Sequence, residues 1–183
     1  MTFYARMGQI PHKRHTQFRR PDGSLYHEEV MGIHGFAGIQ SILYHLRPPT
    51  RVQEVGAVPA DGYSTPDYED GGPLRHRHLR TAAVPAGGDA VEGRVPILGN
   101  QDVVLSLVRP TKAMDYWYRF AHGDEVLFVH DGTGVLECQY GVLHYRPGDY
   151  LVLPTGVLWR LVPDEGVEQR LLVIEAHGHI EPP

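Results

Sequence analysis

The chain has 183 residues and a formal net charge of −5, and its 42% hydrophobic and 21% charged content is typical of one globular domain with an extension. The negative charge argues against general nucleic-acid binding, and no apolar run is long enough to cross a membrane, so neither kind of partner is expected. The single cysteine, Cys138, cannot form an internal disulfide, which predicts a reducing, cytoplasmic location.

The first 50 residues mix basic and apolar side chains. Arg19 stands between apolar residues such as Phe18 and Leu25, which favours an arm that packs on protein over one that grips nucleic acid. The run 39–46 has the composition of a strand. Residues 1–50 are therefore expected to form an arm and first strands that pack on the rest of the chain or on a neighbouring subunit.

Residues 51–100 are rich in Gly and Pro and predict loops with short strands. On a strand, His76 and His78 would point to one side, which is a spacing that metal ligands use. The neighbouring arginines would repel a divalent cation, however, and no carboxylate stands at a known spacing. The preferred interpretation is a basic strand at an interface or at an anionic-ligand site.

Short β-type runs alternate with turn signals over residues 101–176. The runs include VVLSLV, EVLFVH, GVLECQY, DYLVLP and LWRLV, and the turns include DGTG, RPGD and PTG. A last strand, Arg170 to Glu175, follows. Strands at this density predict an all-β, antiparallel barrel that closes on itself.

Two hairpin motifs within this region resemble those of the cupin family. The acid of the first motif, H-x-H-x-x-x-x-E, falls on Glu125, and its later glycine falls on Gly132. The second motif, P-G-D-x-x-x-x-P-x-G-x-x-H, falls on Pro147, Gly148, Asp149, Pro154 and Gly156. The resemblance implies a cupin-type double-stranded β-helix, or jelly roll, with an N-terminal extension.

Aromatic residues occupy the three histidine positions of these motifs, namely Tyr118, Phe120 and Trp159. Alternate strand residues point the same way, so these rings would face inward but supply no nitrogen donor. Only Glu125 remains of the usual ligands. We therefore predict no metal-binding, cofactor-binding or catalytic residue here, with Glu125, if buried, held by Arg119 or a backbone donor.

Longer segments of the chain resemble the homogentisate 1,2-dioxygenases, especially their shorter bacterial relatives. The resemblance is carried by RHTQFRRPDGSLYHEE and by HGDEVLFVHDGTGVLECQYGVLHYRPGDYLVLPTGV, and it extends over nearly the whole chain. It implies two cupin halves, with Fe(II) held by two His and one carboxylate in the second half. These residues would then be the amino-terminal half, with 177–183 as a linker to the second.

For the complete enzyme, the resemblance implies ring cleavage of homogentisate by O2 to maleylacetoacetate in tyrosine catabolism. The partners would be an aromatic small molecule, O2 and further copies of the chain in a homo-oligomer. The half described by this sequence would supply scaffold and subunit contacts rather than catalysis.

Two alternatives stay open. In the first, the chain is a metal-free cupin that binds a small aromatic acid through its aromatic side chains and through Arg119 or Arg160. In the second, it is a metalloenzyme with an irregular ligand set. That set would draw on residues such as His76, His78, His122 and Glu125, and a separate unusual site in the barrel that recruits His122 or His130 also stays open.

Overall fold

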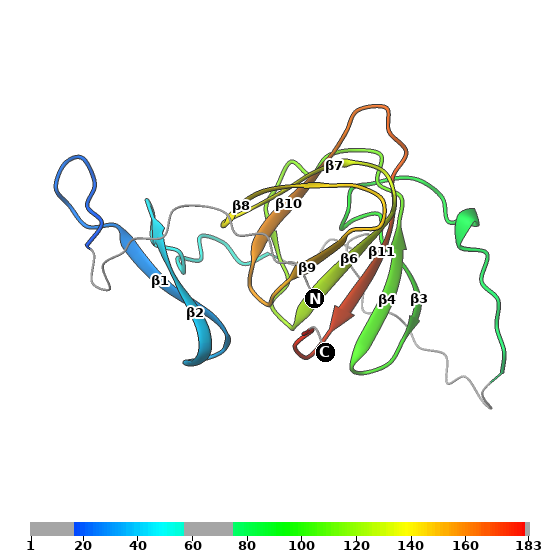
Figure 1. Ribbon diagram of the computed structural model, residues 1–183, viewed down its shortest axis with the longest axis horizontal. Coiled ribbons are helices and arrows are strands. Elements are labelled where there is room, and N and C mark those ends of the chain that lie inside the picture. Colours follow the sequence, from blue (N-terminus) through cyan, green and yellow to red (C-terminus); the bar gives the residue numbers. More distant parts are fainter. Residues whose placement is uncertain (1–16, 57–74, 182–183) are drawn as a thin grey trace. The chain divides into compact units, whose positions relative to one another are not determined.

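The computed structural model describes residues 17–56 and 75–181, and the chain divides into two units, residues 1–57 and 58–183. Each unit has its own β structure (Figure 1). The described residues contain one short helical element, the 3-10 turn Thr81–Ala83, and no helix among them is long and apolar enough to span a membrane.

The first unit contains a two-stranded antiparallel hairpin. Strand β1 (His27–His34) pairs with β2 (Ala37–His45), with His27 opposite His45. β2 confirms the strand expected at 39–46, whereas β1 was not predicted because its sequence, HEEVMGIH, begins with charged residues. An isolated hairpin is marginally stable in water. The packing of residues 1–50 on the barrel or on a neighbouring subunit stays a prediction.

The second unit consists of two antiparallel sheets (Figure 1). The five-stranded sheet contains, in spatial order, β3 (Val95–Gly99), β4 (Val103–Val108), β11 (Arg170–Ala176), β6 (Asp124–Asp131) and β9 (Tyr150–Leu153). The four-stranded sheet contains β5 (Tyr118–Arg119), β10 (Leu158–Pro163), β7 (Gly134–Cys138) and β8 (Gly141–Tyr145). Because the chain crosses repeatedly from one sheet to the other, the fold is the expected all-β, cupin-type double-stranded β-helix.

The barrel begins earlier in the chain than the sequence indicated. Strand β3 lies within residues 51–100, where loops with short strands were expected outside the barrel, yet it pairs with β4 and forms an edge of the larger sheet. The barrel therefore extends beyond the predicted range of 101–176. Residues 75–80, in contrast, form no strand and are exposed, so the interpretation of this segment as a basic strand was wrong.

Alternation along the strands builds the core between the two sheets. On β11, Leu171, Val173 and Glu175 are buried at every second position, and their partners on β6 include Leu127 and Glu125. The opposite sheet contributes side chains such as Trp159 and Leu161, which are fully buried. The interior between these strands is thus largely apolar, and two carboxylates enter it at one end.

Candidate functional site

Two buried carboxylates face each other at this end of the barrel. Glu125 on β6 and Glu175 on β11 are Cα partners and are 1% and 2% exposed. Like charges directly opposite each other on adjacent strands are destabilising, and burial of an unpaired carboxylate is costlier still. The fold therefore requires a cation or a proton at this place.

Arg94 supplies the cation. Its Nη1 donates to Glu125 Oε1 at 2.8 Å and to Glu175 Oε1 at 3.0 Å, while its Nε donates to the carbonyl oxygen of Ala90 at 3.0 Å. The Arg94 side chain is only 1% exposed. The prediction that Arg119 or a backbone donor holds Glu125 was wrong. Arg119 follows the inward-facing Tyr118 on β5, so its own side chain faces outward and is exposed.

A tight turn before β3 places Arg94 inside the barrel. Asp89 is buried, and its Oδ1 accepts hydrogen bonds from the backbone N–H groups of Val91 and Glu92, both at 2.9 Å. At Gly93, a Cβ atom would lie 2.3 Å from the carbonyl oxygen of Gly87, so the close approach of the two segments requires glycine. The turn places Arg94 immediately before Val95, the first residue of β3.

Two of the aromatic residues at the motif's histidine positions surround this ion cluster. The Nε1 of Trp159 donates to Glu125 Oε2 at 3.2 Å. The ring of Tyr118 lies edge-on to Trp159, with centroids 5.4 Å apart, and the Arg94 guanidinium carbon lies 5.5 Å from the centroid of Tyr118. Phe120 does not join them; its ring lies against His122 instead.

Burial and charge set the protonation of the cluster. Burial raises the pKa of Glu125, and the hydrogen-bonded Arg94 opposes that rise only in part. Burial alone would lower the pKa of Arg94, but the charges of Glu125 and Glu175 hold it above its ordinary value. Burial, followed by the negative charge of Glu125, raises the pKa of Tyr118. At neutral pH the centre therefore contains a charged guanidinium beside a neutral phenol.

This set of donors does not fit a metal ion. The retained carboxylate, Glu125, is occupied by a guanidinium and an indole N–H, and a divalent cation next to Arg94 would be repelled. Over residues 17–56 and 75–181, no three His, Cys, Asp or Glu side chains gather as a metal site. In the irregular set, His76, His78 and His122 are exposed, and the last of these stacks on His177.

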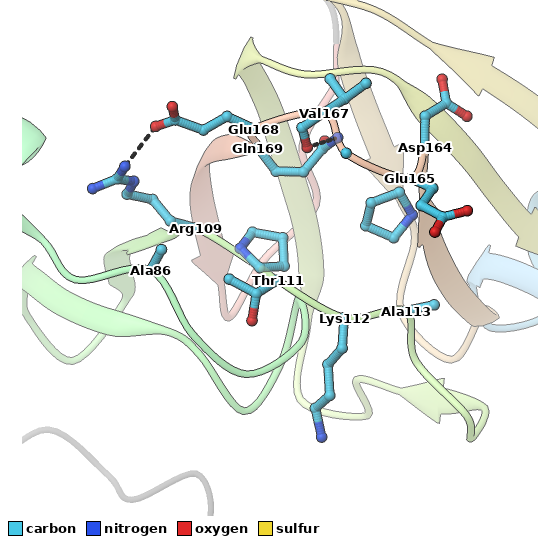
Figure 2. A pocket seen from close by; sticks show the side chains of 13 residues that line it. Ala86, Arg109, Thr111, Lys112, Ala113, Asp164, Glu165, Val167, Glu168 and Gln169 are labelled. Atoms are coloured by element: carbon cyan, nitrogen blue, oxygen red, sulfur yellow. Dashed lines mark hydrogen bonds and ion pairs between the residues drawn. The ribbon is translucent and has the colours of Figure 1, made fainter.

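A separate cleft lies beyond the other end of β4 and β11. It has a volume of about 540 Å³ and lies between the segment after β4 and the loop that joins β10 to β11 (Figure 2). Arg109 Nη2 donates to Glu168 on one side, and the buried Gln169 accepts a hydrogen bond from Tyr145 Oη at 3.1 Å. Val108 pairs with Leu171 near the cleft, whereas Glu175 pairs with Val104, so the ion cluster and the cleft are distinct places.

The motif spacing predicted that Tyr118, Phe120 and Trp159 face inward with Glu125, and the structure brings Tyr118 and Trp159 to the cluster but not Phe120. Arg94 and the cleft were not predicted. Arg94 stands in GGDAVEGRVP, which has no periodic pattern. The signal that could have found it is Glu175. In RLLVIEA this acid occupies the same alternate positions as Leu171 and Val173, and a carboxylate on a buried face requires a partner of opposite charge.

Comparison with known proteins adds a likeness in sequence. No protein-family model matches the chain. Over 176 residues, or 96% of the chain, it is 35% identical to a protein of Saccharolobus solfataricus named "Putative dioxygenase". The match spans 44% of that protein, so the chain covers less than half the length of this curated relative.

Solved cupin structures show a partial likeness. A cupin-2 domain protein of Shewanella frigidimarina is 25% identical with a TM-score of 0.41, over 45% of this chain and 78% of that one. A cupin superfamily protein of Desulfitobacterium hafniense is 15% identical with a TM-score of 0.46, over 57% and 93%. The sheet order described above identifies the fold of this chain as a cupin barrel.

Proposed function

We propose that this chain is the amino-terminal scaffold half of a non-haem Fe(II) ring-cleaving dioxygenase of the homogentisate 1,2-dioxygenase type. The observation that carries the proposal is the Arg94 ion cluster, which stands where the cupin motifs place metal ligands. The likeness to part of a relative named as a dioxygenase supports the same role. A barrel whose centre is already filled by its own cation suits a half that supports a catalytic neighbour.

In this proposal the complete enzyme joins homogentisate and O2 to give maleylacetoacetate, with both oxygen atoms entering the product. Fe(II) would be bound in a second cupin half, where it would bring the two reactants together. The residues of the present chain perform no step of that reaction. Their contribution is a rigid barrel, and contacts between copies in a homo-oligomer.

The test compares two proteins for iron content and for oxygen uptake with homogentisate. One is the 183-residue chain, and the other is the same chain together with any second cupin half encoded downstream in its reading frame. We expect stoichiometric iron and oxygen uptake only in the longer protein. If the longer protein binds iron but does not consume O2 with homogentisate, the substrate assignment is wrong; if it does neither, the enzyme proposal is wrong.

The cleft favours a second candidate function, a metal-free cupin that binds a small molecule. Its volume of about 540 Å³ is within the range of small-molecule sites. The aromatic wall expected from the sequence does not form around it, because Trp159 is buried at the ion cluster and Trp117 lies under Arg160, 5.0 Å from its guanidinium carbon. Calorimetric titration with hydroxylated phenylacetates tests this function. Saturable binding that Thr111→Trp abolishes would support it, and absence of binding would exclude these ligands.

A further inference from the structure

We infer that Arg94 is the built-in cation of this barrel, and that its guanidinium takes over the place and the charge-balancing task that a metal ion has in a cupin with a complete ligand set. The inference rests on the geometry of the barrel and on the positions that the cupin-like motifs occupy in it. It does not depend on the proposed dioxygenase function.

The Arg94 guanidinium lies at the positions that the cupin-like motifs mark. The cupin motifs place four ligands at Tyr118, Phe120, Glu125 and Trp159. Three of these four residues contact the cluster: Glu125 accepts from Arg94, Trp159 donates to the other oxygen of Glu125, and the ring of Tyr118 lies beside the guanidinium. The cation that these positions surround is therefore a side chain of the chain itself.

The charge of the Arg94 guanidinium meets the charges of two buried carboxylates. Glu125 and Glu175 are direct partners across β6 and β11, so the two strands bring two carboxylates together inside the barrel. A guanidinium presents several N–H donors in a planar fork and retains its proton at any pH a protein tolerates. The single positive charge of Arg94 thus offsets one of the two carboxylate charges while its Nη1 donates to both strands at once, and its long side chain lets the turn before β3 place the guanidinium between them.

A cation that belongs to the chain differs from a metal ion because it cannot be removed from the barrel. A metal ion can be removed by a chelator or by protonation of its ligands, whereas a covalently attached guanidinium cannot. The barrel should consequently fold and retain its shape in the complete absence of metal. Its stability should depend on Arg94 because of the charge, not because of the volume that the side chain fills.

A charge-removal series separates charge from packing. Met is an unbranched, neutral side chain of similar length, so Arg94→Met removes the cation while it fills much of the same space. The triple variant Arg94→Met, Glu125→Gln, Glu175→Gln removes both the cation and the carboxylates that need it. Arg119→Met is the matched control, because Arg119 is an exposed arginine of the same barrel.

The measurement is the urea midpoint at neutral pH with EDTA present, followed by circular dichroism. We expect a clear fall for Arg94→Met, recovery of most of that fall in the triple variant, and a midpoint near that of the unaltered chain for Arg119→Met. If Arg94→Met does not fold at all, a folded triple variant still supports the inference. A midpoint unchanged by Arg94→Met, or a triple variant no more stable than the single one, would overturn it.

The effect of metal ions on stability is measured with the unaltered chain. Its urea midpoint should be the same in EDTA and in excess Mn²⁺ or Zn²⁺. A midpoint that EDTA lowers and metal restores, with the restoration lost in Glu125→Gln, would show that a metal ion and not Arg94 balances the centre, and would overturn the inference.

Discussion

Glu125 and Glu175 lie directly opposite each other on β6 and β11, and one nitrogen of Arg94 donates to both. In the middle of a sheet, such a pair of acids would push the strands apart without that guanidinium. A buried ion pair often contributes little net stability compared with an apolar core, but removal of one partner costs about 3–5 kcal/mol because a buried charge is left alone. Each charged member of the cluster is consequently sensitive to substitution.

The hydrogen bond from Trp159 to Glu125 gives the first prediction. Trp159→Phe keeps a ring but removes the Nε1 donor from a buried carboxylate, which should lower the free energy of unfolding by about 1–3 kcal/mol. Trp117→Phe is the control, since Trp117 is 46% exposed and should change stability by less than about 1 kcal/mol. Urea unfolding followed by circular dichroism measures both. Equal effects of the two substitutions would contradict a special role for the indole N–H of Trp159.

The start of β6 gives the second prediction. Gly123 packs so tightly on β11 that an added Cβ would lie 1.7 Å from the carbonyl oxygen of Ala176. Gly123→Ala must therefore displace one of the two strands, at a cost of about 1–3 kcal/mol. Gly178→Ala is the control, because nothing lies within 4 Å of its added Cβ. Thermal unfolding of both variants is the measurement, and a Gly123→Ala protein as stable as the control would show that the strands can yield without cost.

The hairpin strands that carry the cupin motifs could be predicted from the sequence, because Gly and Pro mark every turn and the strands between them alternate. Strand β3 could not, because in VPILG a proline interrupts the pattern and the strand lies at the edge of the sheet, where proline is tolerated. Part of the ion cluster could be predicted from the sequence. Motif spacing located Tyr118, Glu125 and Trp159, and the position of Glu175 in RLLVIEA indicates that a cation is needed. The register of β6 with β11 is required to show that Glu175 meets Glu125.

The raised pKa of Glu125 gives the third prediction. Between the ordinary carboxyl pKa of 4.5 and the higher pKa of the folded state, the unfolded chain has lost this proton while the folded chain retains it. The folded state then binds more protons, so the free energy of unfolding falls as pH rises through this window. Glu125→Gln should remove that part of the pH dependence. Urea midpoints at closely spaced pH values test it, and an identical slope in both proteins would contradict the prediction.

At acidic pH, a different group should control how the free energy of unfolding changes with pH. The hydrogen bond from Arg170 lowers the pKa of the half-exposed Asp131, so its contribution is present above the ordinary value of 3.8 and is lost as pH falls below it. Because this window lies below that of Glu125, Asp131→Asn serves as the control in the same titration. It should leave the slope above pH 4.5 unchanged.

The free nitrogen of the guanidinium gives the fourth prediction. Within the described residues, Arg94 Nη2 is buried and makes no hydrogen bond of ordinary length and angle. Buried N–H groups are nearly always satisfied, and a water molecule is the usual partner when the protein supplies none. A high-resolution crystal structure should therefore show an ordered water within about 3 Å of Nη2. Clear density for the cluster with apolar atoms alone around Nη2 would contradict this.

An anaerobic Fe(II) titration of the 183-residue chain by equilibrium dialysis asks whether Arg94 already occupies the cation position of this barrel. We expect no stoichiometric iron in the unaltered chain and none in Glu125→Gln. One iron per chain, bound by the unaltered protein and lost in Glu125→Gln, would contradict it.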